Sequence, residues 1–343
     1  GDWVMELISF IMPIYNNSKT LARAIDSCLQ QKYPDTEIML VNDGSDDDTY
    51  DIINDYWERY PNIKIVNQRH QGILMARLNG LKNASGDFVT FVDSDDYINN
   101  IYLYELMYTR KYSDMNVVLS RMHFVEKGLF NSTSQIYPNE FLISEHKEAL
   151  LTFDSSLNGK LFRRKDLTLP NYRLSSNEAM SYLYYYLCKE DKIGFSNFAK
   201  YYVTPSKRNF SRTYADENLR KADNIIKSLD IMFDLYRSGK LLNKYFSDIE
   251  AIFIKNIFIE IDRIKNGCND KNITKKTTGI LIKYLNYHFP NWRNNKYLKR
   301  CFIDFNSDLF VKLNLIGLKA GHYKTEASID MAGTLRSLKR MLK

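Results

Sequence analysis

The sequence predicts an α/β protein with a mainly parallel β-sheet and helices on both of its faces, followed by a mainly α-helical C-terminal domain. Three observations carry this prediction. Over the first hundred residues, short apolar runs alternate with segments of helical periodicity, as in successive βαβ units. Three of these runs end in polar turns, two of which are rich in carboxylates. From about Ala215 onwards, apolar residues recur at helical spacing.

The first hundred residues divide into strands and helices by their local patterns. Residues 7–12 form an apolar run that Pro13 ends, which is typical of a buried strand. Ser18 is a suitable N-cap for a helix that carries Leu21 and Leu29 on one apolar face. Further strands are expected at residues 37–41, 63–66 and 87–92, with helices through 52–57 and 73–81 between them.

The later residues complete the expected organisation. A helix is predicted over 99–112, a strand over 116–120 and a long surface loop over 127–140. We expect three parts in the chain. Residues 1–4 precede Met5 and are taken as an expression remnant, residues 5–215 as the α/β domain, and residues 216–343 as a helical accessory domain.

Charge divides the chain near the same boundary. The chain has 48 Lys/Arg and 41 Asp/Glu, a net charge of +7. Residues 217–343 hold 24 Lys/Arg and 13 Asp/Glu, a net charge of +11, which leaves −4 for residues 1–216. An acidic front and a basic back predict two parts with different partners.

Composition and cysteine spacing favour a cytoplasmic globular protein. Hydrophobic residues make up 44% and charged residues 26% of the chain, which excludes a disordered protein. None of the four cysteines lies in a C-x-x-C pair, so buried reduced thiols are expected. The sequence also lacks an apolar run of about 18 residues and a signal-peptide pattern.

The carboxylates of Asp93-Ser94-Asp95-Asp96 follow the fourth expected strand. Three carboxylates within four residues repel one another unless a cation or hydrogen-bond donors offset their charge. Mg²⁺-type cations bind one or two carboxylates together with substrate phosphates, so the cluster indicates a metal site for a diphosphate. In the structural alternative, Asp95 or Asp96 caps a helix that starts near Asn99.

Several other kinds of site find no support. The sequence contains neither the P-loop pattern nor the Gly-rich dinucleotide pattern, and it lacks the G-x-S-x-G motif of serine hydrolases. Its five histidines are scattered, which indicates surface or packing positions rather than a zinc site.

Four segments resemble consecutive motifs of one enzyme family. They are Ile8–Asn17, Val41–Asp47, Gly72–Asn79 and Phe91–Asp96. In order and spacing they are similar to the motifs of the inverting glycosyltransferases of family 2, in particular the bacterial polysaccharide and glycoconjugate type. The resemblance covers residues 5–100 well and extends more weakly to about 215. It implies a GT-A fold and transfer of a sugar from a nucleotide sugar, most often a UDP-sugar.

The resemblance also assigns roles to individual residues. It implies that Asp43 accepts a hydrogen bond from the uracil ring and that Asp95, with Asp93, binds Mn²⁺ or Mg²⁺. The bound metal would offset the charge that grows on the departing diphosphate. The residues expected to bind the nucleotide are Pro13, Tyr15, Asp43, Arg77, Asp93 and Ser94.

The resemblance is weaker at the expected general base. The family places a Glu-Asp pair where this sequence has Asn177-Glu178, so Glu178 is the candidate base and its extra methylene is a departure. Weak or altered activity is the alternative, and so is a non-catalytic scaffold with the same fold. Residues 158–164 resemble a segment near the acceptor. A loop that contacts the diphosphate or acceptor would include Lys160, Lys207, Arg208 and Ser211.

The C-terminal region predicts an anionic partner. Residues 271–300 hold eight Lys/Arg and no Asp/Glu, with five aromatic residues among them. This pattern is typical of contact with the inner face of a membrane or with a lipid-linked, glycan or glycoprotein acceptor. A helical bundle with core aromatics and solvated charges is the alternative. No nucleic-acid-binding motif is present, so nucleic acid is not expected. Residues 335–343 are a candidate basic amphipathic helix for a membrane, bundle or homo-oligomer contact.

Overall fold

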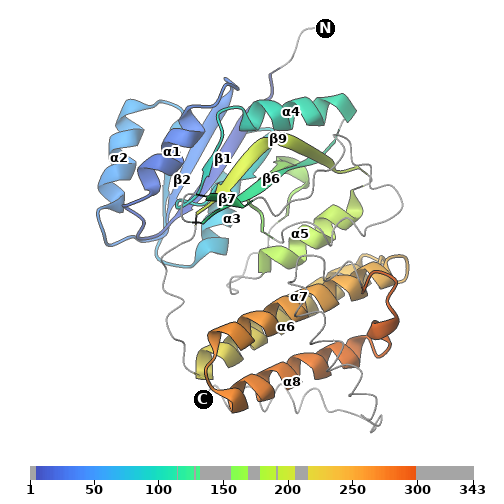
Figure 1. Cartoon of the computed structure of the whole chain (residues 1–343). Helices are drawn as coiled ribbons and strands as arrows, with labels where there is room; N and C mark the ends of the chain where they lie inside the picture. The colour runs from blue at the N-terminus through green and yellow to red at the C-terminus, as the bar shows by residue number, and fades with distance from the viewer. Residues whose placement is uncertain are drawn as a thin grey trace. The chain divides into compact units, whose positions relative to one another are not determined.

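The computed structural model describes residues 5–113, 115–126, 129–131, 156–168, 178–190, 192–204 and 215–298 (Figure 1). Within these residues the chain forms two compact units. The first contains every element from β1 to β9, and the second contains the three long helices that follow. The second unit's first helix begins at Ala215, the residue at which the sequence predicts the change to a helical pattern.

The first unit consists of one sheet and the helices that cover it. Its strands are β1 (Ile8–Ile14), β2 (Thr36–Asn42), β3 (Ile63–Asn67), β4 (Phe88–Phe91), β5 (Tyr97–Ile98), β6 (Val117–Glu126), β7 (Leu129–Asn131), β8 (Lys160–Arg163) and β9 (Gly194–Val203). Its α-helices are α1 (Leu21–Leu29), α2 (Thr49–Arg59), α3 (Ile73–Asn83), α4 (Tyr102–Ser113) and α5 (Glu178–Lys189).

The sheet joins a parallel half to a mixed half. Its strand order is β3-β2-β1-β4-β8-β6-β9-β5, with β7 paired to β6. Strands β1 to β4 pair in parallel, and β6 is parallel to β9. β8 runs antiparallel to both of its neighbours, β4 and β6, so β6 and β4 point the same way. The predicted mainly parallel sheet with helices is confirmed, and three strands, β5, β7 and β8, run antiparallel to their neighbours.

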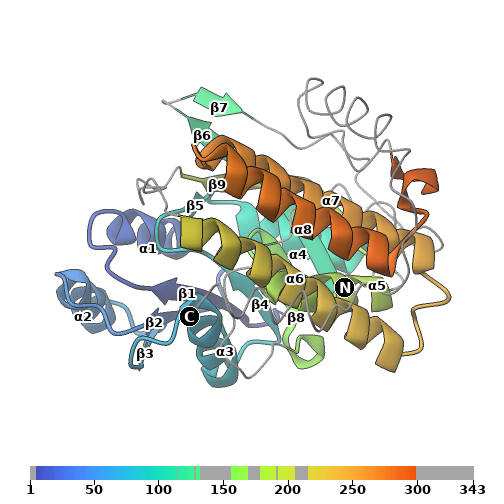
Figure 2. The same ribbon diagram turned by 90° about the horizontal axis from the view of Figure 1, so that it is seen from below.

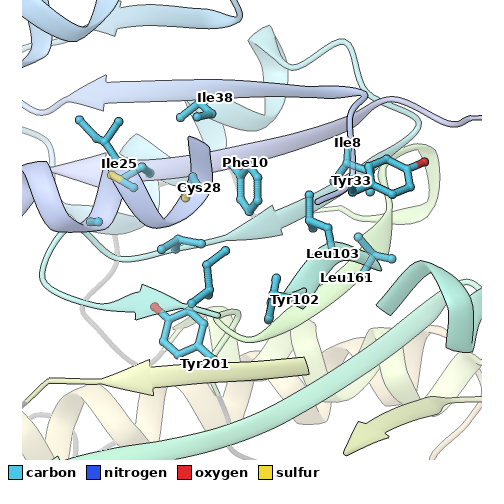
Figure 3. Packing of buried hydrophobic residues seen from close by; sticks show 14 of the residues in the cluster. Ile8, Phe10, Ile25, Cys28, Tyr33, Ile38, Tyr102, Leu103, Leu161 and Tyr201 are labelled. Atoms are coloured by element: carbon cyan, nitrogen blue, oxygen red, sulfur yellow. The ribbon is translucent and has the colours of Figure 1, made fainter. Parts of the chain in front are cut away.

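Helices cover both faces of the sheet because consecutive strand residues point to opposite sides. One face of β1 contributes Ile8 and Phe10 to a core shared with Ile25 and Cys28 of α1 and Leu103 of α4 (Figure 3). Packing on the other face requires a glycine. A methyl group at Gly80 of α3 would overlap the side chain of Ile11 in β1. The glycine therefore lets α3 lie directly on the sheet.

A buried carboxylate fixes the amino end of the sheet. Glu37 of β2 accepts hydrogen bonds from the Ser9 hydroxyl (2.5 Å), from the Ser85 amide and hydroxyl (both 2.6 Å) and from the Lys64 ammonium (2.6 Å). Burial by itself would raise the pKa of Glu37, but these donors outweigh burial and lower the pKa to about 2. Glu37 thus holds the turn from which β4 begins.

The stability of the protein is expected to fall as the pH drops from about 4.5 to about 2, through protonation of Glu37. A carboxylate whose pKa is lowered in the folded state stabilises that state above its unfolded pKa, and the contribution disappears below the folded pKa. The shift corresponds to roughly 3 kcal/mol. Urea unfolding at pH 7 and pH 3 measures it. Glu37→Gln should lose this part of the pH dependence and the exposed control Glu58→Gln should keep it, whereas equal pH dependence in both would contradict the assignment.

The second unit is a helical bundle with an aromatic core. α6 (Ala215–Ser238), α7 (Phe246–Gly267) and α8 (Lys271–His288) pack against one another, and a short turn of 3-10 helix, η3 (Trp292–Asn294), follows (Figure 2). The rings of Phe253 and Phe289 lie 4.9 Å apart, and the Tyr284 hydroxyl donates to Asp230 at 2.6 Å. Asp270 caps α8 by accepting from two backbone amides of its first turn.

Most aromatic residues interleaved in the basic region 271–300 belong to this core. Tyr284, Phe289, Trp292 and Tyr297 are buried, while Tyr287 is 54% exposed. Basic side chains of the described part of this region lie on the surface, namely Lys271, Lys275, Lys276, Lys283, Arg293 and Lys296. The core alternative is therefore right for four aromatics, and the surface charge remains available to an anionic partner.

Three sequence expectations need comment. The predicted Ser18 cap is wrong: α1 begins at Leu21 after Thr20, because residues 17–20 form a hydrogen-bonded turn first. The predicted structural role of Asp95 or Asp96 as a helix cap is also wrong, since β5 follows this loop and α4 begins only at Tyr102. Most of the predicted 127–140 loop lies outside the described residues, although 129–131 form β7. Among the described helices, none combines the length and low polarity needed to cross a membrane.

Candidate active site

The polar turns of the parallel strands meet at one edge of the sheet. Because β1 to β4 run in the same direction, the residues that follow them lie along the carboxyl edge, where ligands bind in sheets of this type. Tyr15 follows β1, Asp43 follows β2, Gln68 follows β3 and Asp93 follows β4 by two residues. Four segments distant in sequence therefore form one candidate site.

Asp93 is held by a buried arginine and a buried asparagine. The Arg77 guanidinium, from α3, donates to one carboxylate oxygen of Asp93 at 2.8 Å and to the Asn158 side-chain oxygen at 3.0 Å. The Asn158 amide donates to the other Asp93 oxygen at 2.6 Å. Arg77 and Asn158 are 6% and 5% exposed. The Asp93 charge is thus offset, and its carboxylate has a fixed orientation.

The three carboxylates of the 93–96 loop come together. Asp93, Asp95 and Asp96 each place one oxygen within 4.8 Å of the others. Hard oxygen donors at this spacing fit a divalent cation such as Mn²⁺ or Mg²⁺. Asp96 is the most buried, 4% exposed, and burial together with the charge of Asp93 raises its pKa to about 7.

Neighbouring segments fix the backbone of this loop. The Asn17 amide donates to the Ser94 hydroxyl at 2.7 Å, and the Thr20 hydroxyl donates to the Ser94 carbonyl at 3.0 Å. Arg23 of α1 donates to the Asp95 carbonyl at 2.7 Å. The predicted nucleotide-binding residue Ser94 is buried, 6% exposed, and its hydroxyl bonds to Asn17 in the turn before α1.

Asp43 organises the segment between β3 and α3. One of its oxygens accepts from the Gln71 amide (2.7 Å) and the Gln68 side chain (2.6 Å), and the other accepts from the Gly72 amide (2.8 Å). Its carboxylate also lies 3.0 Å from Nδ1 of His70. Gly44, with φ +73°, allows this segment to approach, since a Cβ at this position would lie 2.9 Å from the backbone nitrogen of His70. A uracil N–H that binds Asp43 would have to share or displace one of these donors.

His70 is a residue of the site that no sequence motif indicates. Its ring stacks on Tyr15 with centroids 4.0 Å apart and an interplanar angle of 29°, and its side chain is 56% exposed. This exposure agrees with the surface position expected for the scattered histidines, but the sequence gives no sign of the contact with Tyr15. The position of His70 two residues before Gly72, inside the connection to α3, is the sequence feature that could have revealed this residue. The pair of rings forms an aromatic surface beside Asp43.

The remaining predicted site residues have varied surroundings. Pro13 is buried within β1, opposite Val41 of β2. Lys160 is a buried residue, 2% exposed. Its ammonium donates to the carbonyls of Ser156 (2.7 Å) and Asn158 (3.1 Å), so it supports the turn that carries Asn158. Glu178 is the first residue of α5, and its side chain lies outside the described residues. Also outside them are Asn177, Lys207, Arg208 and Ser211.

A family comparison agrees with this arrangement. The model described as "Glycosyl transferase family 2" matches residues 9–168, which contain the whole carboxyl-edge constellation. This region belongs to glycosyltransferase family 2. The resemblance seen in the four sequence motifs is thereby confirmed.

Individual relatives match over different lengths. The uncharacterized glycosyltransferase EpsJ of Bacillus subtilis is 36% identical over 115 residues, which are 34% of this chain and 33% of EpsJ. An uncharacterized glycosyltransferase of Haemophilus influenzae is 44% identical over 97 residues and 39% of its length, so the chain spans only about a third of these two relatives. The cholesterol galactosyltransferase of Borreliella burgdorferi is 26% identical over 274 residues, 72% of this chain and 76% of that enzyme.

The fold extends to a solved structure. The crystal structure of S. aureus TarS 1-349 aligns with a TM-score of 0.53 and 21% identity, and the alignment covers 94% of each chain. At 21% identity this match establishes a similar fold and nothing about activity. The expected GT-A-type α/β fold with helices after it is thereby confirmed.

Proposed function

We propose that this chain is an inverting glycosyltransferase that moves a sugar from a UDP-sugar to an acceptor hydroxyl, with a divalent cation in the Asp93–Asp96 loop. The observation that carries this proposal is the cluster of Asp93, Asp95 and Asp96 at the carboxyl edge of a family 2 domain. Arg77 and Asn158 hold Asp93 in place beside this cluster. Mn²⁺ or Mg²⁺ bound there would stabilise the negative charge that develops on the departing diphosphate.

The other side chains of the edge would bind and orient the nucleotide. Tyr15 and His70 offer an aromatic surface beside Asp43, whose carboxylate fixes the 68–72 segment. Asp95 would bind the cation most directly, because its carboxylate lies in the cluster while Arg23 holds its backbone carbonyl. Glu178, at the start of α5, would accept the proton of the attacking hydroxyl.

Relatives suggest which ligands to test first. Crystal structures of S. aureus TarS are known in complex with UDP and with UDP-GlcNAc. Acceptors named for the relatives differ, since one is a cholesterol galactosyltransferase and another, from Bacillus spizizenii, a poly(ribitol-phosphate) beta-glucosyltransferase. The acceptor of this chain is therefore proposed only as a hydroxyl of a glycan, lipid-linked or protein-linked molecule.

UDP release from a panel of UDP-sugars with Mn²⁺ tests the proposal, and Glu178→Gln should lower kcat by at least about 100-fold. The amide cannot accept the proton, and a positioned base contributes on the order of 10²–10⁴ in rate. Affinity for UDP and Mn²⁺ should stay unchanged. Glu190→Gln, just after the other end of α5, is the control and should keep full activity. UDP binding with metal but no turnover of any donor and acceptor would instead favour the non-catalytic scaffold.

Contact with a membrane remains a prediction. It rests on exposed Lys276, Lys283 and Tyr287, which share one face of α8 by their spacing of seven and four residues. Co-sedimentation with vesicles that contain or lack anionic lipid tests this prediction. Equal binding to both kinds of vesicle, or binding to neither, would contradict it.

A further inference from the structure

We propose that Asp96 acts as a buried anchor rather than as a metal ligand, and that with Tyr201 it is a positioning residue for the metal-binding backbone of Asp93 and Asp95. This inference rests on the function proposed above. It assigns roles to one residue of the carboxylate cluster and to one residue of β9 that no sequence motif indicated.

Tyr201 connects β9 to the first carboxylate of the loop. Its side chain is fully buried in the core between the sheet and its helices (Figure 3). The Tyr201 hydroxyl accepts from the Asp93 amide at 3.0 Å and donates to Asp96 at 2.8 Å. A single hydroxyl therefore satisfies a backbone group of Asp93 and orients the Asp96 carboxylate at the same time.

Both oxygens of Asp96 are engaged by protein donors. Oδ2 accepts from Tyr201, and Oδ1 accepts from the Thr204 amide at 2.8 Å. Asp96 is 4% exposed, whereas Asp93 and Asp95 are only partly buried. The Asp96 carboxylate is therefore the least accessible of the three. Burial separates Asp96 from Asp93, whose oxygens also accept hydrogen bonds, from Arg77 and Asn158: the Asp93 side chain is 24% exposed, whereas Asp96 is nearly inaccessible. A carboxylate that is buried and bonded on both oxygens is suited to hold the loop.

A second bridge reaches the same point of β9 independently. One Arg23 nitrogen donates to the Asp95 carbonyl at 2.7 Å and to the Thr204 hydroxyl at 2.9 Å. Thr204 thus contacts Asp96 through its amide and Asp95 through Arg23. The end of β9 therefore fixes the main chain on both sides of Asp95, within the loop that carries the carboxylate cluster.

Tyr201→Phe is expected to weaken Mn²⁺-dependent UDP binding about 10-fold or more, as loss of a residue that orients metal ligands commonly does. Uridine binding should stay unchanged, because uridine has no diphosphate to engage the metal. Isothermal titration of UDP with and without Mn²⁺, and of uridine, measures both. Absence of Mn²⁺-dependent UDP binding in the unaltered protein would count against the proposed function, whereas unchanged binding in the variant would overturn only the positioning role.

Tyr102→Phe is the matched control. Tyr102 is equally buried, and its hydroxyl lies 3.1 Å from the Thr90 hydroxyl, away from the loop. It should lose stability without losing Mn²⁺-dependent UDP affinity, and an equal affinity loss in both variants would overturn the proposal. If Tyr201→Phe fails to fold, Mn²⁺-dependent UDP affinity is measured in Asp96→Asn and Asp96→Ala instead. An anchoring residue should lose less affinity with Asn, which still accepts a hydrogen bond, than with Ala. Equal loss with Asn and Ala would contradict the anchor.

Discussion

Asp95→Ala is expected to lower kcat/KM for UDP-sugar turnover by at least about 10³-fold, the largest effect of any single substitution in the site. A metal that acts as a Lewis acid contributes several kcal/mol to the transition state, and each 1.36 kcal/mol corresponds to about tenfold in rate. Loss of the Asp95 carboxylate would remove one of the two ligands that face the proposed cation. Steady-state kinetics over a range of Mn²⁺ concentrations measures the change.

A control at the opposite end of β4 separates chemistry from folding. Asp87 is exposed at the amino end of β4, and Asp87→Ala should retain activity. The melting temperature of Asp95→Ala should be at least as high as that of the unaltered protein without metal, because removing Asp95 also removes repulsion from Asp93 and Asp96. Full activity in Asp95→Ala would rule out metal binding by this loop.

Arg77→Met is expected to lower both stability and metal affinity. The guanidinium of Arg77 is 7% exposed as a side chain and bonds Asp93 and Asn158. Removing it leaves the Asp93 charge without its partner, and breaking a buried pair costs about 3–5 kcal/mol. Since the Asp93 side chain is 24% exposed, solvent screens part of this cost, and we expect a smaller decrease of about 2–3 kcal/mol in the free energy of unfolding. Urea unfolding and Mn²⁺-dependent UDP binding measure the two effects.

Arg110→Met provides the matched comparison. Arg110 forms a pair with Glu6 at 2.9 Å in the same unit, with side chains 11% and 22% exposed, and so resembles the Arg77–Asp93 pair in burial. Both variants should lose stability, but only Arg77→Met should lose metal-dependent UDP affinity. Equal UDP affinity in the two variants would mean that Arg77 has a purely structural role.

Local sequence was sufficient for most elements of the parallel half. The predicted strands at 37–41 and 63–66 differ from β2 and β3 by one residue at either end at most, since apolar runs and helical spacing are local properties. Helix ends were harder. Ser18 has the chemistry of an N-cap, yet the turn formed by residues 17–20 delays α1 to Leu21. Competing local hydrogen bonds of this kind are not visible in residue type alone.

Contacts between residues far apart in the chain could not be predicted from local sequence. β8 lies between β4 and β6 although it follows both in the chain, because strand pairing depends on packing between distant segments. The contacts from Tyr201 to Asp93 and from Asn158 to Asp93 join residues 108 and 65 positions apart. His70 acquires significance only when β1 and β3 bring it against Tyr15.

The sequence by itself determined the α/β class, the family 2 motifs, the carboxylates of the 93–96 loop and the change to helices near Ala215. These properties reside in short segments whose composition and spacing carry the information. Only the tertiary structure decided which partners the buried carboxylates have. Arg77 and Asn158 donate hydrogen bonds to Asp93, and Ser85 donates to Glu37 at the turn before β4. Asp96 accepts hydrogen bonds from Tyr201 and Thr204. Each of these depends on which buried donor lies opposite which carboxylate, and that is set by the packing of strands and helices far apart in the chain.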